Sequence, residues 1–151
     1  MTNTPATTSR TIISLVKIGH LLTKQLNKSL VREFSLTFNQ VFILFHVEHC
    51  PNQVSPKQLA DRLVVSLPNV TAILQRLKND HYLVQKQSNQ DRRQHFLTLT
   101  IKGKRLLKRI QAAWPPSELR DIDETLRQLP LPQQRLLTKT LGELMVYLRE
   151  Q

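Results

Sequence analysis

The chain has 151 residues, 40% of them hydrophobic, which is enough for one domain with a buried core. Its 22 Lys and Arg residues against 11 Asp and Glu residues give a net charge of +11, which favours a polyanion as the principal partner. No apolar run of about 18 residues and no signal-peptide core occur, and the single cysteine, Cys50, excludes an internal disulfide. We therefore expect a single cytoplasmic domain over residues 1–151, with no membrane contact.

Residues 10–35 predict a long first helix that has too many apolar positions for one buried face. The aliphatic residues of its first half are Ile12, Ile13, Leu15, Val16, Ile18, Leu21 and Leu22. A helix that is apolar on two sides must bury both, and a chain of this size offers few neighbours. We therefore expect the helix to pack against a second copy of the chain, with Ile13 and Val16 in the interface.

Two capping boxes predict where the next two helices begin. Thr37-x-x-Gln40 predicts a helix that ends at Cys50-Pro51, because the residue before a proline resists the α conformation. Ser55-Pro56-x-Gln58 predicts a second helix that starts at Pro56. Val54, just before it, is a candidate for a short strand that pairs with the hairpin predicted further along the chain.

Ser66 is a further N-cap candidate, and it predicts a helix over residues 67–78 with two different faces. The apolar residues at helical spacing, which predict the buried face, are Val70, Ile73, Leu74 and Leu77. The side chains on the other face that can donate to base edges or phosphates are Asn69, Thr71, Gln75, Arg76 and Lys78. Two short helices joined by a tight turn, with a polar outer face on the second, are typical of a helix-turn-helix.

The apolar pattern then changes from helical to alternating spacing. Residues 82–86 and 95–99 are β-prone runs, and the polar, basic loop between them carries Asp91-Arg92-Arg93 near its tip. Two such runs joined by a loop of this length predict a hairpin that projects from the helical body. In a DNA-binding protein such a hairpin is a wing.

Thr100 is the N-cap candidate for a connecting helix at residues 101–114, with an apolar face made of Ile101, Leu106, Leu107 and Ile110. Trp114-Pro115-Pro116 ends this helix, and a short acidic helix starts near Ser117. A last helix over residues 133–148 is rich in leucine. Its expected interface residues are Leu137, Leu141, Leu144 and Leu148.

The motifs, taken in this order, resemble the multiple-antibiotic-resistance regulator (MarR) family. The resemblance covers about residues 10–150 and rests on Leu36-Thr37-x-x-Gln40, Ser66 to Thr71 with Leu77, Tyr82-Leu83-Val84, Asp91-Arg92-Arg93 and Leu97-Thr98-Leu99-Thr100-x-x-Gly103. His81 departs from the pattern, because the family usually has Gly after the recognition helix. We therefore expect a non-glycine residue in the left-handed region at this turn.

The resemblance implies a mainly α fold with a small β wing (α+β). A winged helix-turn-helix lobe at residues 36–100 would hang from a dimerisation platform made by residues 10–35 and 117–150, with residues 101–114 as the connecting helix. It also implies a homodimeric transcription regulator, expected to be a repressor, on a near-palindromic operator with half-sites about 10 bp apart. The implied DNA-binding residues are Lys57, Ser66, Pro68, Asn69, Thr71, Gln75, Arg76, Lys78, Lys86, Asp91, Arg92 and Arg93.

In the family, a small aromatic or amphipathic effector commonly relieves DNA binding from a crevice between the platform and the lobe. The candidate wall residues in this chain are His20, Phe34, Phe38, Phe45, His46 and Trp114. Each of them is equally compatible with an ordinary core position. The resemblance therefore implies an effector without identifying it.

The sequence carries no motif for catalysis, since its three glycines form neither G-x-x-x-x-G-K nor G-x-G-x-x-G. We expect neither enzyme activity nor a cofactor.

His46, His49 and Cys50 have a spacing that suits metal ligands, although a closed metal site needs about four ligands. A metal- or thiol-responsive member of the same family is therefore one alternative function. The other is an architectural DNA-binding or helical protein-interaction dimer that binds every duplex about equally.

Overall fold

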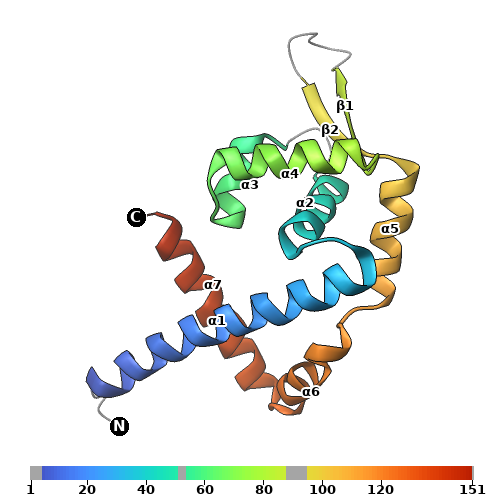
Figure 1. Ribbon diagram of the computed structural model, residues 1–151. Helices are drawn as coiled ribbons and strands as arrows, with labels where there is room; N and C mark the ends of the chain where they lie inside the picture. The colour runs from blue at the N-terminus through green and yellow to red at the C-terminus, as the bar shows by residue number, and fades with distance from the viewer. Residues whose placement is uncertain (1–4, 51–53, 88–94, 151) are drawn as a thin grey trace.

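The computed structural model describes residues 5–50, 54–87 and 95–150 (Figure 1). One part of the molecule is a lobe made of α2 (Phe38–His49), α3 (Pro56–Leu63), α4 (Leu67–Asn79), β1 (Leu83–Gln87), β2 (His95–Leu99) and α5 (Ile101–Ala112). The other part consists of α1 (Pro5–Phe34), the 3-10 helix η1 (Ser117–Leu119), α6 (Arg120–Gln128) and α7 (Leu131–Arg149). Helices with a single small hairpin confirm the predicted fold class.

The hydrophobic core lies in the lobe and is centred on α2. Ile43 and Leu44 of α2 are completely buried, and Leu59, Val70 and Leu77 of α3 and α4 pack into the same cluster. The C-terminal end of α1, the hairpin and α5 complete the core with Leu30, Leu36, Leu83, Leu97, Leu99, Leu106, Leu107 and Ile110. By contrast, α7 contributes no buried residue. A single chain therefore has a core in the lobe but leaves its terminal helices largely exposed.

The predicted helix starts are confirmed by their hydrogen bonds. Both capping boxes form: the Thr37 amide donates to Gln40 Oε1 at 2.8 Å, and the Ser55 amide donates to Gln58 Oε1 at 3.1 Å. Thr100 caps α5, because its Oγ1 accepts from the Gly103 amide at 3.0 Å. Ser66 occupies the N-cap of α4, as expected, and its side chain makes no capping hydrogen bond.

Among the described residues, three non-glycine residues adopt left-handed backbone conformations, namely Ser35, Val64 and His81. At His81, with φ of 58°, this confirms the expectation for the turn after α4. The turn closes in the Schellman pattern: the Tyr82 amide donates to the Leu77 carbonyl at 2.9 Å, and the His81 amide donates to the Lys78 carbonyl at 3.0 Å. The left-handed conformation costs an L-residue roughly 1–2 kcal/mol.

We expect His81→Gly to raise the free energy of unfolding by about 0.5–1 kcal/mol, because glycine has no Cβ to strain this turn but adds backbone entropy to the unfolded chain. Urea unfolding at a fixed protomer concentration measures the change. His49→Gly is the matched control, since His49 lies in the helical region of α2 and glycine should destabilise the protein there. An H81G protein less stable than wild type would show that the His81 side chain stabilises the turn.

A compact clasp joins the C-terminus of α4 to the N-terminus of α5. Thr100 Oγ1 donates to the His81 carbonyl at 2.6 Å, and Lys102 Nζ donates to the Asp80 carbonyl at 2.8 Å while lying 4.7 Å from the centre of the Tyr82 ring. Gly103 sits against the backbone of Tyr82 so closely that a Cβ would overlap the Tyr82 carbonyl oxygen. This contact is a physical reason for the spacing of Thr100 and Gly103, and it fixes the C-terminus of α4 against the N-terminus of α5.

Several expectations about single residues were wrong. Ile101 was expected on the buried face of α5, but its first-turn side chain points to solvent and is 72% exposed. Val54 is buried against the core, but in the part of the chain that is described it does not pair with the hairpin, which has only two strands. The last helix begins at Leu131, two residues before the expected start, with Pro132 in its first turn.

Candidate nucleic-acid interface and apolar cavity

Helix α4 has one buried and one solvent-facing side, as its sequence predicts. Val70, Leu74 and Leu77 lie in the core, and Ile73 packs against it. The exposed side chains opposite them are Pro68, Asn69, Thr71, Ala72, Gln75, Arg76 and Asn79. Figure 1 shows α4 along the outer side of the lobe, close to the base of the β1–β2 hairpin. The polar face of this helix is therefore free to meet a large partner.

The chemistry of this face suits an anionic partner that also offers hydrogen-bonding groups. Helix α4 contains no Asp or Glu, and Arg76 and Lys78 lie in its last turn. Gln75 Nε2 donates to Asn79 Oδ1 at 2.9 Å, and Thr71 Oγ1 donates to the Leu67 carbonyl at 3.0 Å. Asn79 was missed from the sequence, although its position four residues after Gln75 is the signal that could have found it.

A groove of about 150 Å³ runs between α4 and the hairpin. Thr71, Gln75 and Lys78 line one side of the groove, and Gln85 and Phe96 line the other. The polar face of α4 and the base of the hairpin therefore share one concave surface. A groove of this kind allows both elements to contact one ligand.

The predicted DNA-binding residues in the described part of the chain are all accessible to solvent. Lys57 and Ser66 are exposed near the starts of α3 and α4, and Lys86 is exposed on β1. Lys78 is half-buried. Asp91, Arg92 and Arg93 lie outside the described residues. The accessible set spans three neighbouring elements of the lobe.

Helix α5 carries a basic surface of its own. It has no acidic residue, and its exposed cations are Lys102, Lys104, Arg105, Lys108 and Arg109. The Arg109 guanidinium lies 5.8 Å from the centre of the Phe34 ring of α1. None of these side chains forms an ion pair with a carboxylate within residues 5–50, 54–87 and 95–150. Within the described ranges, no carboxylate therefore neutralises the positive charge of α5 through an ion pair.

An apolar cavity of about 410 Å³ lies between α2 and α5. It contains three of the six predicted effector residues, Phe38, Phe45 and Trp114. The other lining residues are Val41, Phe42, Leu107, Ile110 and Gln111. Gln111 is the one strongly polar side chain among them. The walls of the cavity therefore suit an apolar or aromatic group better than a carboxylate.

The other three predicted effector residues do not line this cavity. His20 is exposed on α1, and Phe34 lies beneath Arg109. The His46 ring stacks on Phe42 with ring centres 6.2 Å apart. Burial lowers the pKa of His46, and so does electrostatic repulsion from Arg62 and His49. Sequence spacing could not distinguish them, because the packing of α2 on α5 decides which side chains meet.

The histidines near the end of α2 make aromatic contacts. His49 stacks on Phe45 with ring centres 4.1 Å apart, and its Nδ1 lies 2.8 Å from the Phe45 carbonyl oxygen. Cys50 is a free, partly buried cysteine at the C-cap. Within the described ranges, no three His, Cys, Asp or Glu side chains come together as a metal site would require.

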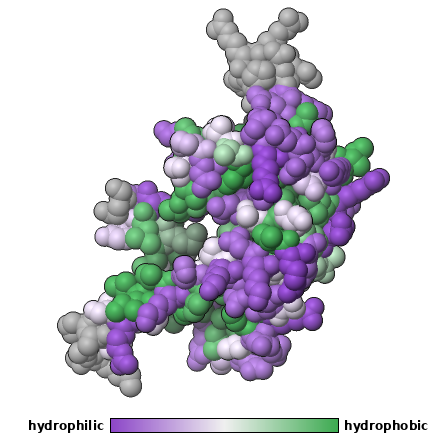
Figure 2. Space-filling view, viewed as in Figure 1, coloured by the Kyte–Doolittle hydropathy of each residue, from purple (hydrophilic) through white to green (hydrophobic). Residues whose placement is uncertain are grey.

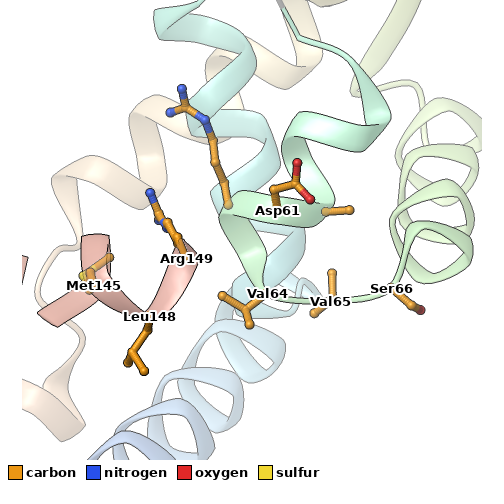
Figure 3. Close-up of a pocket in the computed structure, with 9 residues that line it drawn as sticks. Asp61, Val64, Val65, Ser66, Met145, Leu148 and Arg149 are labelled. Atoms are coloured by element: carbon orange, nitrogen blue, oxygen red, sulfur yellow. The ribbon is translucent and has the colours of Figure 1, made fainter. Parts of the chain in front are cut away.

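A wider, open hollow of about 660 Å³ separates the α3–α4 turn from the end of α7 (Figure 3). Val64 and Val65 lie on the lobe side of the hollow, and Met145, Leu148 and Arg149 lie on the α7 side. Val64 is 82% exposed although its side chain is apolar. Its backbone is in the left-handed conformation. This hollow lies between α7 and the lobe, and none of the six predicted effector residues lines it.

The predicted dimerisation residues are exposed in the single chain. Figure 2 shows hydrophobic surface at the lower left of the molecule, where Figure 1 places the N-terminal half of α1. The predicted interface residues, each more than one-third exposed, are Ile13, Val16, Leu137, Leu141, Leu144 and Leu148.

No helix in the described part of the chain is long and apolar enough to span a membrane.

An ion pair joins α1 to the segment that precedes α6. Arg32 Nη1 lies 2.6 Å from Glu118 Oε1 of η1. The pKa of Glu118 is lowered to about 2, first by the buried Ser29 hydroxyl, then by its own backbone amide and the Ser117 hydroxyl, and also by Arg32. The charged form of Glu118 therefore stabilises the junction between the two ends of the chain.

This arrangement predicts a pH-dependent stability difference between wild type and Glu118→Gln. Because the folded-state pKa is depressed, the contribution of Glu118 is complete above its ordinary pKa of 4.5 and is lost as the pH falls from about 4.5 to about 2. Thermal unfolding should show E118Q less stable than wild type at pH 7, with the two melting temperatures converging near pH 2. A constant difference across this range would contradict the assignment.

Comparison with known proteins supports the architecture found here. The sequence profile of the MarR family matches residues 34–94, which include α2 to β1. No curated protein matches the chain. Among solved structures, AbsC from Streptomyces coelicolor, a MarR family transcriptional regulator, is 25% identical with a TM-score of 0.76, and the match covers 100% of this chain and 98% of AbsC.

Two further structures share the fold at lower identity. FabT of Streptococcus pneumoniae, solved in complex with DNA, is 24% identical with a TM-score of 0.70, over 94% of this chain and 97% of FabT. CouR of Rhodococcus jostii RHA1, bound to p-coumaroyl-CoA, is 18% identical with a TM-score of 0.73, over 87% of this chain and 88% of CouR. The family match covers residues 34–94 and the architecture is shared across the chain, so this protein is similar to MarR family regulators and has their winged-helix fold.

Proposed function

We propose that this protein is a DNA-binding transcription regulator whose helix α4 enters the major groove. The observation that carries the proposal is the exposed face of α4, which offers amide, hydroxyl and guanidinium groups and no carboxylate. Amide and guanidinium groups match the hydrogen-bonding edges of bases, whereas Lys and Arg bind phosphates. FabT supports the proposal as a relative of the same fold that was solved in complex with DNA.

The charge of the lobe would supply affinity that does not depend on sequence. The cations of α5, together with Lys57 and Lys86, are exposed on the same lobe as the polar face of α4. Each phosphate that such a cation neutralises releases counterions and makes binding weaker at higher salt. Specificity would then come from Asn69, Thr71, Gln75 and Arg76.

We infer further that the protein acts as a homodimer on a near-palindromic operator and represses transcription by blocking the promoter. The support for a dimer is physical: Leu137, Leu141, Leu144 and Leu148 recur at intervals of three and four residues, so they form one stripe along α7. A stripe of exposed leucine side chains is stable in water only when something covers it. Two copies related by a two-fold axis would place two α4 helices about one turn of DNA apart.

Selection from a pool of random short duplexes, with the full-length protein, tests this function. We expect enrichment of an inverted repeat with half-sites about 10 bp apart. At moderate salt its affinity should exceed that for random duplex by about 10³-fold or more. Equal binding to all duplexes would favour the architectural alternative instead.

The sequence of the hairpin loop adds a prediction for the wing. We expect Arg92→Ala to weaken operator binding by about 1–3 kcal/mol, because a wing places its tip in the minor groove. Folding stability should change by less than about 0.5 kcal/mol. Titration against the operator at constant salt measures the first quantity and thermal unfolding the second. Wild-type affinity in R92A would remove Arg92 from the interface.

The cavity between α2 and α5 favours a second function, the binding of a small aromatic or amphipathic effector. Trp114 is the single tryptophan of the chain and lines the cavity, so its fluorescence reports occupancy directly. A saturable fluorescence change that parallels release of the operator would support effector control. Trp114→Phe is the control, because it should abolish the signal. Loss of DNA binding without any fluorescence change would place the effector elsewhere.

A further inference from the structure

The side chain of Gln75 is held in one orientation on the reading face of α4. Its Nε2 donates to Asn79 Oδ1 at 2.9 Å, one turn further along the helix, and both residues are exposed. Fixing Nε2 towards Asn79 also fixes the opposite end of the amide, Oε1. Gln75 then presents one free N–H donor and one carbonyl acceptor to whatever enters the groove.

This donor and acceptor, side by side, match one base in particular. Adenine offers the N7 acceptor and the N6 amino donor to the major groove, and a glutamine amide can bind both together. Guanine offers N7 and O6, which are both acceptors. The Oε1 atom of Gln75, also an acceptor, would then face O6, and no hydrogen bond could form between these two oxygens. A glutamine that is free to rotate could turn its NH₂ group towards guanine, and the bond to Asn79 opposes that rotation.

We propose that Gln75 reads an adenine in each half-site and that Asn79 is the positioning residue that fixes the amide for this base. The inference rests on the proposed function and adds to it the identity of one base. Asn79 has no need to touch DNA in this arrangement. Its effect should therefore appear in base preference more than in overall affinity, because a neutral amide releases no counterions.

The first experiment finds the adenine. The selected operator is resynthesised with 7-deazaadenine, which lacks the N7 acceptor, or with purine, which lacks the 6-amino group, at each adenine in turn. At one adenine per half-site we expect both analogues to weaken wild-type binding by about tenfold or more. With Gln75→Leu the same analogues should cost nothing further at that position.

The second experiment separates positioning from contact. Asn79→Leu removes the acceptor, and we expect the adenine-over-guanine preference at that position to fall by about twofold, which is what one exposed glutamine–asparagine pair four residues apart on a helix can contribute. Asn79→Asp keeps an acceptor oxygen for Gln75 Nε2, so it should retain the preference while weakening binding to all duplexes through its negative charge. Gln128→Leu is the matched control, because Gln128 Nε2 makes the same kind of bond to Glu124 on α6, away from α4.

The outcomes distinguish this inference from the function on which it rests. If an operator is selected but Asn79→Leu keeps the full adenine preference, the positioning role is wrong. If no adenine in the operator depends on Gln75, the base assignment is wrong while the regulator function stands. If no duplex is enriched at all, the proposed function fails and this inference fails with it.

Discussion

Leu144→Asp is expected to disrupt the proposed dimer and to leave a largely monomeric protein with weak operator binding. Leu144 lies in the leucine stripe of α7 and is 40% exposed in the single chain, with no partner from its own core. A carboxylate buried in an apolar interface without a partner costs several kcal/mol, which corresponds to a dimer weakened by about 100-fold or more. Because a monomer keeps the contacts of one half-site only, operator affinity should fall as well.

Sedimentation of wild type and variant over a dilution series measures the effect. Arg135→Asp is the matched control, because residue 135 lies about two and a half helical turns before Leu144, on the opposite face of α7. It introduces the same carboxylate without entering the stripe, so the dimer should persist. A compact, thermally stable wild-type monomer at micromolar concentration that still bound a palindrome tightly would contradict both the dimer and the platform.

The parts of the fold that could be predicted from the sequence are those fixed by neighbouring residues. The capping boxes at Thr37 and Ser55 form because side chain and amide lie only three residues apart. The buried face of α4 follows from helical spacing, and the hairpin from two alternating runs around a polar loop. The left-handed turn at His81 was predicted from the resemblance to the MarR family, in which a glycine usually follows the recognition helix.

The features that could not be predicted from the sequence depend on how the helices and strands pack against one another. Ile101 has the spacing of a core residue, yet the first turn of α5 points it outward, beyond the reach of α2. The cavity is lined by Phe38, Phe45 and Trp114. His46 does not line it, because Phe42 lies between the cavity and the His46 ring. Gln75 was predicted as a reading residue, whereas its bond to Asn79 required side-chain positions. Sequence spacing indicates faces of helices, and packing decides which faces share a site.

Gly103→Ala should have the largest effect of any small substitution on the lobe. The added Cβ would overlap the Tyr82 carbonyl oxygen, which also accepts the Thr100 amide at 3.0 Å, so the oxygen cannot move without loss of that hydrogen bond. Overpacking against well-packed atoms costs about 1–3 kcal/mol, while alanine gains at most about 1 kcal/mol over glycine within a helix. The cost of the overlap exceeds the helical gain, and we expect the free energy of unfolding to fall by about 1–2 kcal/mol.

The same substitution should reduce DNA binding, because the clasp of Thr100, Lys102 and Gly103 sets the direction of α4 and the base of the hairpin. Gly142→Ala is the matched control: Gly142 also lies in a helix, α7, but its added Cβ meets no atom within 4 Å in the described structure. It should stabilise the protein by about 0.5–1 kcal/mol. Urea unfolding at one protomer concentration compares the two variants. If G103A unfolds at the same urea concentration as wild type, the contact with Tyr82 yields without cost, and the clasp does not hold α4 in place.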